Sequence, residues 1–196
     1  MLSKLLKKKS LFCILYKIDK KIAEQYQAKP CPHCGGPLHY ANYLRKPRGG
    51  PDDIPEKYLL QFSLCCGAEA CRRRVKDPSC RFNGRKVYWH AFILIIISER
   101  QQPKHSDINI FKLSKMFNVS RNTITRWLHY YKEEFPFSRE WKRIRGQVIA
   151  SLKNDELPSN LINYFLNLKA SGQEALVSCL KFLSRGSDFY WKIREE

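Results

Sequence analysis

The chain has 196 residues, and 43% of them are hydrophobic. That content is enough for one large domain or two small ones, and it excludes a chain that is disordered throughout. Lysine and arginine number 36 against 18 aspartate and glutamate, which gives a net charge of +18. So basic a surface attracts polyanions, and in a chain of this size a nucleic acid is the more frequent partner than an anionic membrane.

Residues 1–28 predict a basic amphipathic helix, because they contain neither proline nor glycine. Leu11, Leu15, Ile18 and Ile22 recur at intervals of three or four residues, which places them on one helical face. Up to residue 29 there are eight lysines and two acids. The helix therefore packs on the body of the protein, grips phosphates, or does both. Its apolar run LFCILY is too short for a signal-peptide core, so no secretion signal is expected.

The cysteines predict a reducing compartment and a metal site. Six of the eight cysteines lie between residues 31 and 80. A secreted disulfide scaffold is normally shorter and follows a signal peptide, so thiolates that bind metal are the better interpretation. The longest other apolar run, AFILIII at 91–97, is far too short to cross a bilayer, and no membrane partner is expected.

The pattern CPHCGG at 31–36 is typical of a zinc knuckle, because its spacing turns two thiolates toward one ion and its glycines permit the tight backbone. A second pair comes from LCCGAEAC, in which one cysteine is again followed by glycine and lies five residues before the next. The predicted ligands of one structural Zn²⁺ are Cys31, Cys34, Cys66 and Cys71. A closed site of four thiolates supports folding, because it leaves no open position for chemistry.

Other ligand sets remain open at this point. Cys65 is an alternative to Cys66, although the two should point to opposite sides of a strand. Cys80 is an alternative to Cys71, and His33 or His39 would supply a nitrogen ligand.

Residues 29–84 form the predicted zinc-ribbon domain. KYLLQFSLCC at 57–66 predicts one strand, and SCRFNGRK at 79–86 predicts another that leads into a turn at Asn83–Gly84. Between the cysteine pairs, RKPRGGPDDIPEK at 45–57 is either a projection that reaches a nucleic-acid groove or a solvated loop. The cations beside the second pair, in RRRVK, are predicted to contact phosphates: Arg72, Arg73, Arg74 and Lys76.

Residues 85–135 predict helices. RKVYWHAFILIIISE at 85–99 is too long and too continuous for an ordinary strand, so a buried helix is expected. In the next helix Ile110, Leu113, Met116 and Phe117 should line one inward face. Asn118 is suited to a left-handed turn, because asparagine tolerates that conformation best after glycine.

The segment after Asn118 predicts a helix-turn-helix whose second helix, 120–132, enters a DNA major groove. Ser120 is a fitting N-cap, and Ile124 and Leu128 should face inward. Residues 112–132 contain five cations and no carboxylate. Arginine, asparagine and threonine are the side chains that read base edges and phosphates. The predicted DNA-contacting residues of this unit are Lys115, Ser120, Arg121, Asn122, Thr123, Thr125 and Arg126.

Residues 136–196 begin with a basic stretch around Trp141 and continue with two predicted helices. These are SNLINYFLNLKA at 159–170 and GQEALVSCLKFLSR at 172–185, both with apolar residues at helical spacing. They should pack on the body or mediate dimerisation. The expected fold class is mainly α with a small β zinc ribbon, in four segments: 1–28, 29–84, 85–135 and 136–196.

The order of CPHC, CCGAEAC and LSKMFNVSRNTITRWL resembles the small zinc-ribbon and helix-turn-helix proteins of bacterial insertion sequences. Those are the DNA-end-binding products, or N-terminal regions, of transposases, and the resemblance covers about residues 31–132. It implies zinc, sequence-specific binding of double-stranded DNA and a cytoplasmic, nucleoid-associated location in a bacterium. A second copy of the chain, or a recombinase or transposase, is the protein partner to expect. The long insert between the cysteine pairs and residues 136–196 depart from the family pattern.

We expect the protein not to be an enzyme. A transposase or nuclease needs clustered carboxylates to hold divalent ions across a phosphate, and here the acids are scattered. The acidic pairs are Asp52 and Asp53 in a loop, Glu133 and Glu134 at a helix end, and Asp155 and Glu156 in a turn. The alternative is a catalytic transposase, recombinase or nuclease with an unrecognised active site, and RNA binding is a third reading.

Overall fold

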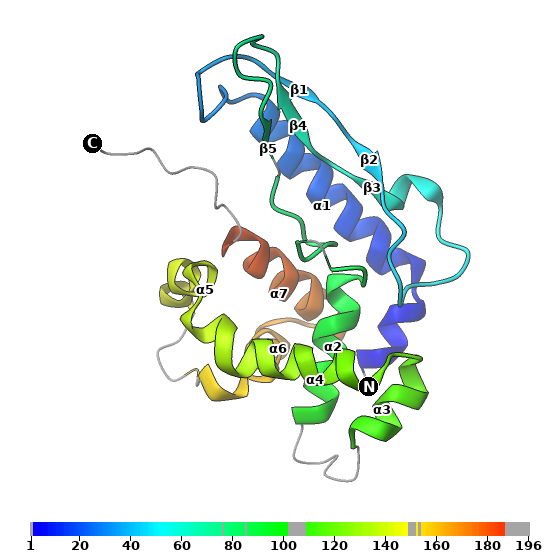
Figure 1. Cartoon of the computed structure of the whole chain (residues 1–196). Helices are drawn as coiled ribbons and strands as arrows, with labels where there is room; N and C mark the ends of the chain where they lie inside the picture. Colours follow the sequence, from blue (N-terminus) through cyan, green and yellow to red (C-terminus); the bar gives the residue numbers. More distant parts are fainter. Residues whose placement is uncertain are drawn as a thin grey trace.

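The computed structural model describes residues 2–75, 77–84, 86–101, 109–148, 152 and 154–186. Lys76 of the predicted basic patch and residues 187–196 of the last segment therefore lie outside the described residues. The described chain is mainly helical, with a small amount of antiparallel sheet at one end (Figure 1). The expected fold class is confirmed at that level.

The N-terminal segment forms a 3-10 helix, η1 (Leu2–Lys7), and a long helix, α1 (Lys9–Gln27). Leu11, Phe12 and Leu15 are fully buried, so the predicted apolar face packs on the body of the protein. Helix α1 runs along the strands on one side and contacts α7 (Gly172–Gly186) on the other (Figure 1). A phosphate-binding role for its lysines stays a prediction.

The strands form two short antiparallel ladders. Strands β1 (Leu38–Tyr40), β4 (Leu64–Cys66) and β5 (Arg74–Val75) make a three-stranded sheet in the order β1-β4-β5. Strands β2 (Tyr43–Leu44) and β3 (Leu60–Gln61) make a separate pair. Leu38 lies opposite Cys66 in the larger sheet, which fixes the register beside the second cysteine pair.

The prediction of one strand over 57–66 is wrong. That segment begins within a 3-10 helix, η2 (Glu56–Leu59), and continues as β3 and β4, which pair with different partners. Between the two ladders, the Asn42 side-chain oxygen accepts the Ser63 backbone N–H at 3.1 Å. The side chain of Asn42 thus replaces a backbone partner, and a continuous strand is interrupted at this point.

The prediction of a strand over 79–86 is also wrong, because this segment wraps around a buried carboxylate. Asp19 of α1 accepts hydrogen bonds from the Ser79 hydroxyl and the Cys80 backbone N–H, both at 2.6 Å. Asp19 also accepts from Arg81 Nε at 2.7 Å. Side-chain bonds take the place of a strand ladder here. The predicted turn is confirmed, since Gly84 has φ +55° in the left-handed region.

Helix α2 (His90–Gln101) is the centre of the molecule. Every residue from His90 to Glu99 is buried, which confirms the buried helix and explains its apolar surface on all sides. The predicted helix began too early, because Tyr88 and Trp89 form isolated bridges with Arg48 and Phe82 before the helix starts.

The remaining elements pack on α2 or on one another. They are α3 (Ile110–Phe117), α4 (Arg121–His129), a π-helix (Tyr130–Glu134), η5 (Phe135–Phe137), α5 (Arg139–Ile144), η6 (Arg145–Gln147), η7 (Asn154–Glu156), α6 (Ser159–Leu168) and α7. Helices α6 and α7 contact each other and α2, so the predicted C-terminal helices pack on the body. One apolar core joins side chains from η1 through α7.

A second, smaller core of six buried side chains lies beside the cysteine pairs: Tyr26, Cys31, Leu38, Leu64, Cys66 and Val75. Because Tyr26 belongs to the last turn of α1, one helix contributes to both cores. None of the helices in the described part of the chain combines the length and the apolar character that crossing a membrane requires.

Candidate metal centre and basic helical surface

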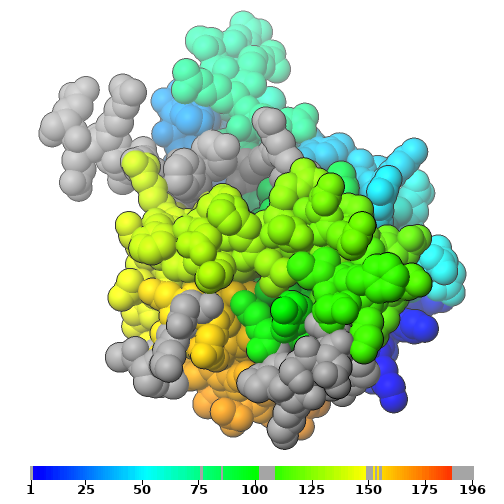
Figure 2. All heavy atoms as spheres, turned by 60° about the horizontal axis from the view of Figure 1, so that its bottom comes forward, coloured from blue at the N-terminus to red at the C-terminus, as the bar shows by residue number. Residues whose placement is uncertain are grey.

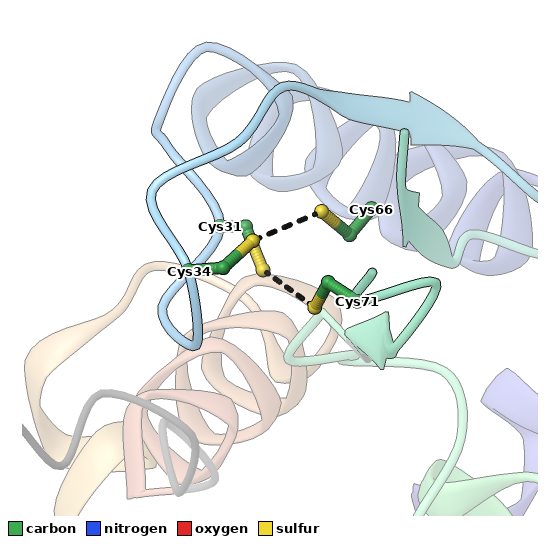
Figure 3. A group of neighbouring side chains, drawn as sticks. All are labelled: Cys31, Cys34, Cys66 and Cys71. Atoms are coloured by element: carbon green, nitrogen blue, oxygen red, sulfur yellow. Dashed lines mark hydrogen bonds between the residues drawn. The ribbon is translucent and has the colours of Figure 1, made fainter. Parts of the chain in front are cut away.

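Four thiols converge at the end of the three-stranded sheet (Figure 3). The Sγ atoms of Cys31, Cys34, Cys66 and Cys71 all lie within 4.8 Å of one another. The Cys34–Cys66 pair is 3.4 Å apart and the Cys31–Cys71 pair is 4.0 Å apart. Thiolates that hold a tetrahedral zinc at about 2.3 Å lie roughly 3.8 Å from one another. The four predicted ligands are therefore placed where one metal ion fits between them.

The backbone explains how each pair turns toward the centre. Gly35 adopts φ +76°, which closes a tight loop in which its N–H donates to the Cys31 carbonyl at 2.8 Å. A Cβ atom on Gly36 would lie 3.2 Å from the Cys66 sulfur, so this position leaves room for the thiols. In the second pair Arg72 has φ +45°, and its N–H donates to the Ala68 carbonyl at 3.0 Å.

The electrostatics of the cluster favour a cation. The Gly36 backbone hydrogen bond, together with bonds from the neighbouring thiols, lowers the pKa of Cys34 to about 7. A backbone hydrogen bond at Ala68 favours the Cys66 thiolate, but burial and the other thiols outweigh it and raise the pKa to about 12. Four thiolates at these distances repel one another unless a positive ion lies between them.

The alternative ligands lie outside this group. The Cys65 thiol points to the Arg72 carbonyl, 3.4 Å away, on the other side of its strand. Cys80 is buried in the larger core, 3.5 Å from the Ser184 hydroxyl. His33 lies 3.3 Å from Arg73 Nη1, and the His39 ring packs over Gly67. Of the described residues, only the four predicted cysteines form a group with metal-binding distances.

Helices α3 and α4 are joined by a turn with the predicted backbone. Asn118 has φ 50° and ψ 48°, the left-handed conformation, and its N–H donates to the Ser114 carbonyl. Ser120 caps α4, since its hydroxyl accepts the Thr123 backbone N–H at 3.2 Å. Val119 between them is 2% exposed and plugs the turn. The capping and turn chemistry read from the sequence is confirmed.

One residue of the predicted inward face of α3 is misplaced. Leu113 is fully buried and Phe117 packs edge-on against Phe92 of α2, but Met116 is 54% exposed. Leu113 and Phe117 are four residues apart and form the line of contact with α2. Met116 lies beside that line and borders an open pocket next to η1.

Helix α4 separates its side chains cleanly into two faces. Ile124 is fully buried and Trp127 is 5% exposed, and both belong to the larger core. The Thr123 hydroxyl lies 2.8 Å from that of Ser120, so these two predicted DNA contacts are engaged in the cap. Four predicted contacts on α4 are exposed and take no part in the cap: Arg121, Asn122, Thr125 and Arg126.

The exposed face of α4 is positive toward its N-terminus. The nearby ion pairs within the described residues lie at and after its C-terminal end, between His129 and Glu134 and between Lys132 and Glu133. Lys115 of α3 is exposed, with its ammonium 4.5 Å from the centre of the Phe111 ring. In Figure 2 the light-green atoms of α4 and α5 form a continuous band across one face of the molecule.

The predicted phosphate contacts beside the cysteines lie apart from the basic face of α4. Arg72, Arg73 and Arg74 are exposed, and the Arg74 guanidinium lies 5.5 Å from the centre of the Tyr43 ring. Strand β5, which contains Arg74, lies toward the C-terminal end of α1, whereas α3 and α4 lie toward its N-terminal end (Figure 1). A helix of 19 residues is roughly 28 Å long, so the two basic regions are separate surfaces.

A third basic surface had no function assigned to it from the sequence. On α5 and η6, Lys142, Arg143 and Arg145 are exposed, while Trp141 and Ile144 are buried. The sequence carried a signal for this surface, because cations stand beside two apolar residues, Trp141 and Ile144, that are three positions apart.

None of the known protein-family models matches this chain, and no curated protein or solved structure shows significant similarity to it. Function is therefore inferred from the geometry of these sites.

Proposed function

We propose that the protein binds double-stranded DNA in a sequence-specific way, with α3 and α4 acting as a helix-turn-helix. The observation that carries this proposal is the exposed, acid-free face of α4. An α-helix with its side chains is about 10–12 Å wide, and the DNA major groove is about 12 Å wide. Burial of Ile124 and Trp127 fixes the orientation of that face, so the ordering of the helix costs little when DNA binds.

Each exposed side chain of α4 has a defined role in this proposal. Arg121 and Arg126 read guanine through paired hydrogen bonds, and Asn122 reads adenine in the same way. Thr125 contacts a thymine methyl group or a phosphate. Ser120 and Thr123 hold the first turn of the helix, and its free backbone N–H groups face a phosphate. Lys115 holds the DNA backbone beside the groove, and Arg72, Arg73 and Arg74 hold phosphates further along the duplex.

We also propose that the four cysteines hold one structural Zn²⁺ in a zinc ribbon. Four sulfur ligands favour zinc in a tetrahedral site, and the spacing of the sulfurs supports this assignment. The ion would cross-link the loop at Cys31–Gly36 to the turn after β4. Its contribution is to the stability of the ribbon and to the placement of the adjacent arginines.

The order of the two cysteine pairs, a helix and the α3–α4 unit supports a relationship to the insertion-sequence proteins described above. We therefore propose an accessory or regulatory role at a bacterial mobile element, in the cytoplasm with the nucleoid. A second copy of the chain, or a recombinase or transposase, would be the protein partner. We assign the protein no catalytic step.

The experiment that tests this function is selection of bound duplexes from random and source-genome DNA near physiological salt. A discrete motif that is lost in Arg121→Ala and Asn122→Ala is the expected result, and Lys142→Ala is the control that matches the charge removed in Arg121→Ala. Enrichment without a motif would show that net charge alone binds the DNA. Magnesium-dependent nicking of the selected duplex would instead support the catalytic alternative.

A further inference from the structure

A groove of about 360 Å³ lies between α1 and α7, away from the surfaces already described. Its apolar floor includes Ile18, Ile22 and Pro78. Three cations stand around it: Lys21 from α1, and Lys181 and Arg185 from α7. The two helices contact each other, although these residues are about 160 positions apart in the chain (Figure 1). The tertiary fold brings the charges together.

The three cations that line this groove carry the same charge, and all three side chains are exposed. Among the described residues, none of the three has a carboxylate within salt-bridge distance. Lys181 and Arg185 are four residues apart on one helix, where like charges repel. The dipole of α7 favours a cation in its last turn, which accounts for Arg185 but not for Lys21 on the neighbouring helix.

We propose that this groove binds a small organic phosphate with an apolar body, of the size of a nucleoside monophosphate. The phosphate would lie between Lys21, Lys181 and Arg185, which supply the charge-assisted hydrogen bonds that a dianion requires. The Ile18–Ile22 floor covers the flat, apolar part of the ligand. The volume is at the lower end of the range for ligand pockets, which suits one nucleotide.

A duplex fits this groove less well than a small ligand does. Backbone phosphates of B-DNA follow a convex cylinder, and the cations here surround a concave floor that is partly apolar. The proposal is independent of DNA binding by α4, because none of its residues belongs to α3 or α4.

Calorimetric titration of the full chain with AMP, adenosine and inorganic phosphate tests the proposal. AMP should bind with one site per chain, phosphate more weakly, and adenosine not measurably. The double variant Lys181→Ala/Arg185→Ala should weaken AMP binding by roughly tenfold or more, since each loses a charged hydrogen bond. Lys17→Ala removes an exposed lysine of α1 outside the groove and should leave the affinity unchanged.

Three results would overturn the proposal. They are failure of AMP to bind at millimolar concentration, equal affinity in the double variant and the wild type, and an equal loss in Lys17→Ala. Competition with duplex DNA distinguishes a free phosphate ligand from a DNA phosphate. If the duplex displaces AMP and the double variant loses DNA affinity, the groove is a DNA contact. A thermal melt of each variant confirms that it is folded, and Lys181→Arg should retain binding.

Discussion

Asp19 on α1 and Arg81 in the loop before α2 form an ion pair that is almost completely closed to water. The Arg81 Nε donates to an Asp19 carboxylate oxygen at 2.7 Å, and their side chains are 0% and 2% exposed. The Arg81 guanidinium also donates to the carbonyls of Tyr58 and Leu60. Three segments that are distant in the sequence are thereby joined at one guanidinium.

Removal of one partner of this pair should destabilise the protein strongly. Asp19→Ala leaves the Arg81 charge buried and unpaired, and we expect a loss of about 3–5 kcal/mol in the free energy of unfolding. Urea denaturation followed by circular dichroism measures this change. Asp53→Ala, which removes an exposed partner of Lys9, is the matched control and should change stability little. Equal effects of the two substitutions would contradict the structural role of the buried pair.

Asp77 should make stability fall as pH rises. Its buried carboxylate oxygens have no hydrogen-bond partner among the described residues, and burial together with the charge of Asp19 raises the pKa of Asp77 to about 7. A folded-state pKa above the unfolded value means that the folded state binds the proton more tightly. Stability from this group is present below about pH 4 and is lost as pH rises to about 7.

Asp77→Asn should therefore raise the free energy of unfolding at pH 8 by up to about 4 kcal/mol, with a much smaller effect at pH 4. Denaturant titrations of both proteins across this pH range provide the measurement. A difference between variant and wild type that does not change with pH would exclude Asp77 as the titrating group.

Loss of the metal should unfold the cysteine region. Cys34→Ser removes one of the four proposed ligands, and we expect the variant to lose both the proposed zinc and the order of the β1-β4-β5 sheet. Elemental analysis should give one zinc per chain in the wild type and less than one in the variant. Cys65→Ser is the matched control, because that thiol points out of the group. Full stability with one bound zinc in Cys34→Ser would contradict the ligand assignment.

The exposed residues of α4 should carry specificity. Arg121→Ala and Asn122→Ala are each expected to cost about 1–3 kcal/mol in binding to the selected duplex, with less effect on random DNA. Fluorescence anisotropy at several salt concentrations separates base contacts from phosphate contacts, since only the latter change the salt dependence strongly. An equal loss on specific and random DNA would mean that both residues contact only the backbone.

The left-handed residue between α3 and α4 offers a test of the turn alone. Asn118→Ala should lower stability by about 1 kcal/mol, because a Cβ without a polar side chain is disfavoured at φ 50°. Asn118→Gly should be neutral or slightly stabilising, because glycine adopts this conformation without strain. Thermal denaturation distinguishes the two variants, and a larger loss in the glycine variant would argue for a side-chain role of Asn118.

Local chemistry was readable from the sequence, and long-range pairing was not. Neighbours within a few residues determine the conformation of Asn118 and the cap at Ser120. The cysteine group was predictable because thiolates in closely spaced pairs are typical metal ligands. The strand predicted over 57–66 is interrupted where the Asn42 side chain binds Ser63, and the strand predicted over 79–86 is replaced by hydrogen bonds to Asp19. Neither partner is visible from β-propensity or alternation.

The separation of the basic surfaces was likewise hidden. The segment that leads into β5 and the start of α4 look alike in charge, yet β5 and α4 lie toward opposite ends of α1 (Figure 1). The groove at Lys21 and Lys181 is formed by helices from the two ends of the chain, so no single stretch of sequence shows its residues together. Met116 was misassigned because a three-four spacing in an eight-residue helix does not determine which edge of the face is covered.

The shared use of α1 by both cores has a thermodynamic consequence. Leu11 and Leu15 belong to the large core and Tyr26 to the small one, within one unbroken helix. Disorder of either core removes packing from the helix that the other core also uses, so each core should stabilise the other. Occupancy of the cysteine cluster would then shift the melting temperature of helices that supply no ligand, by an amount set by metal concentration.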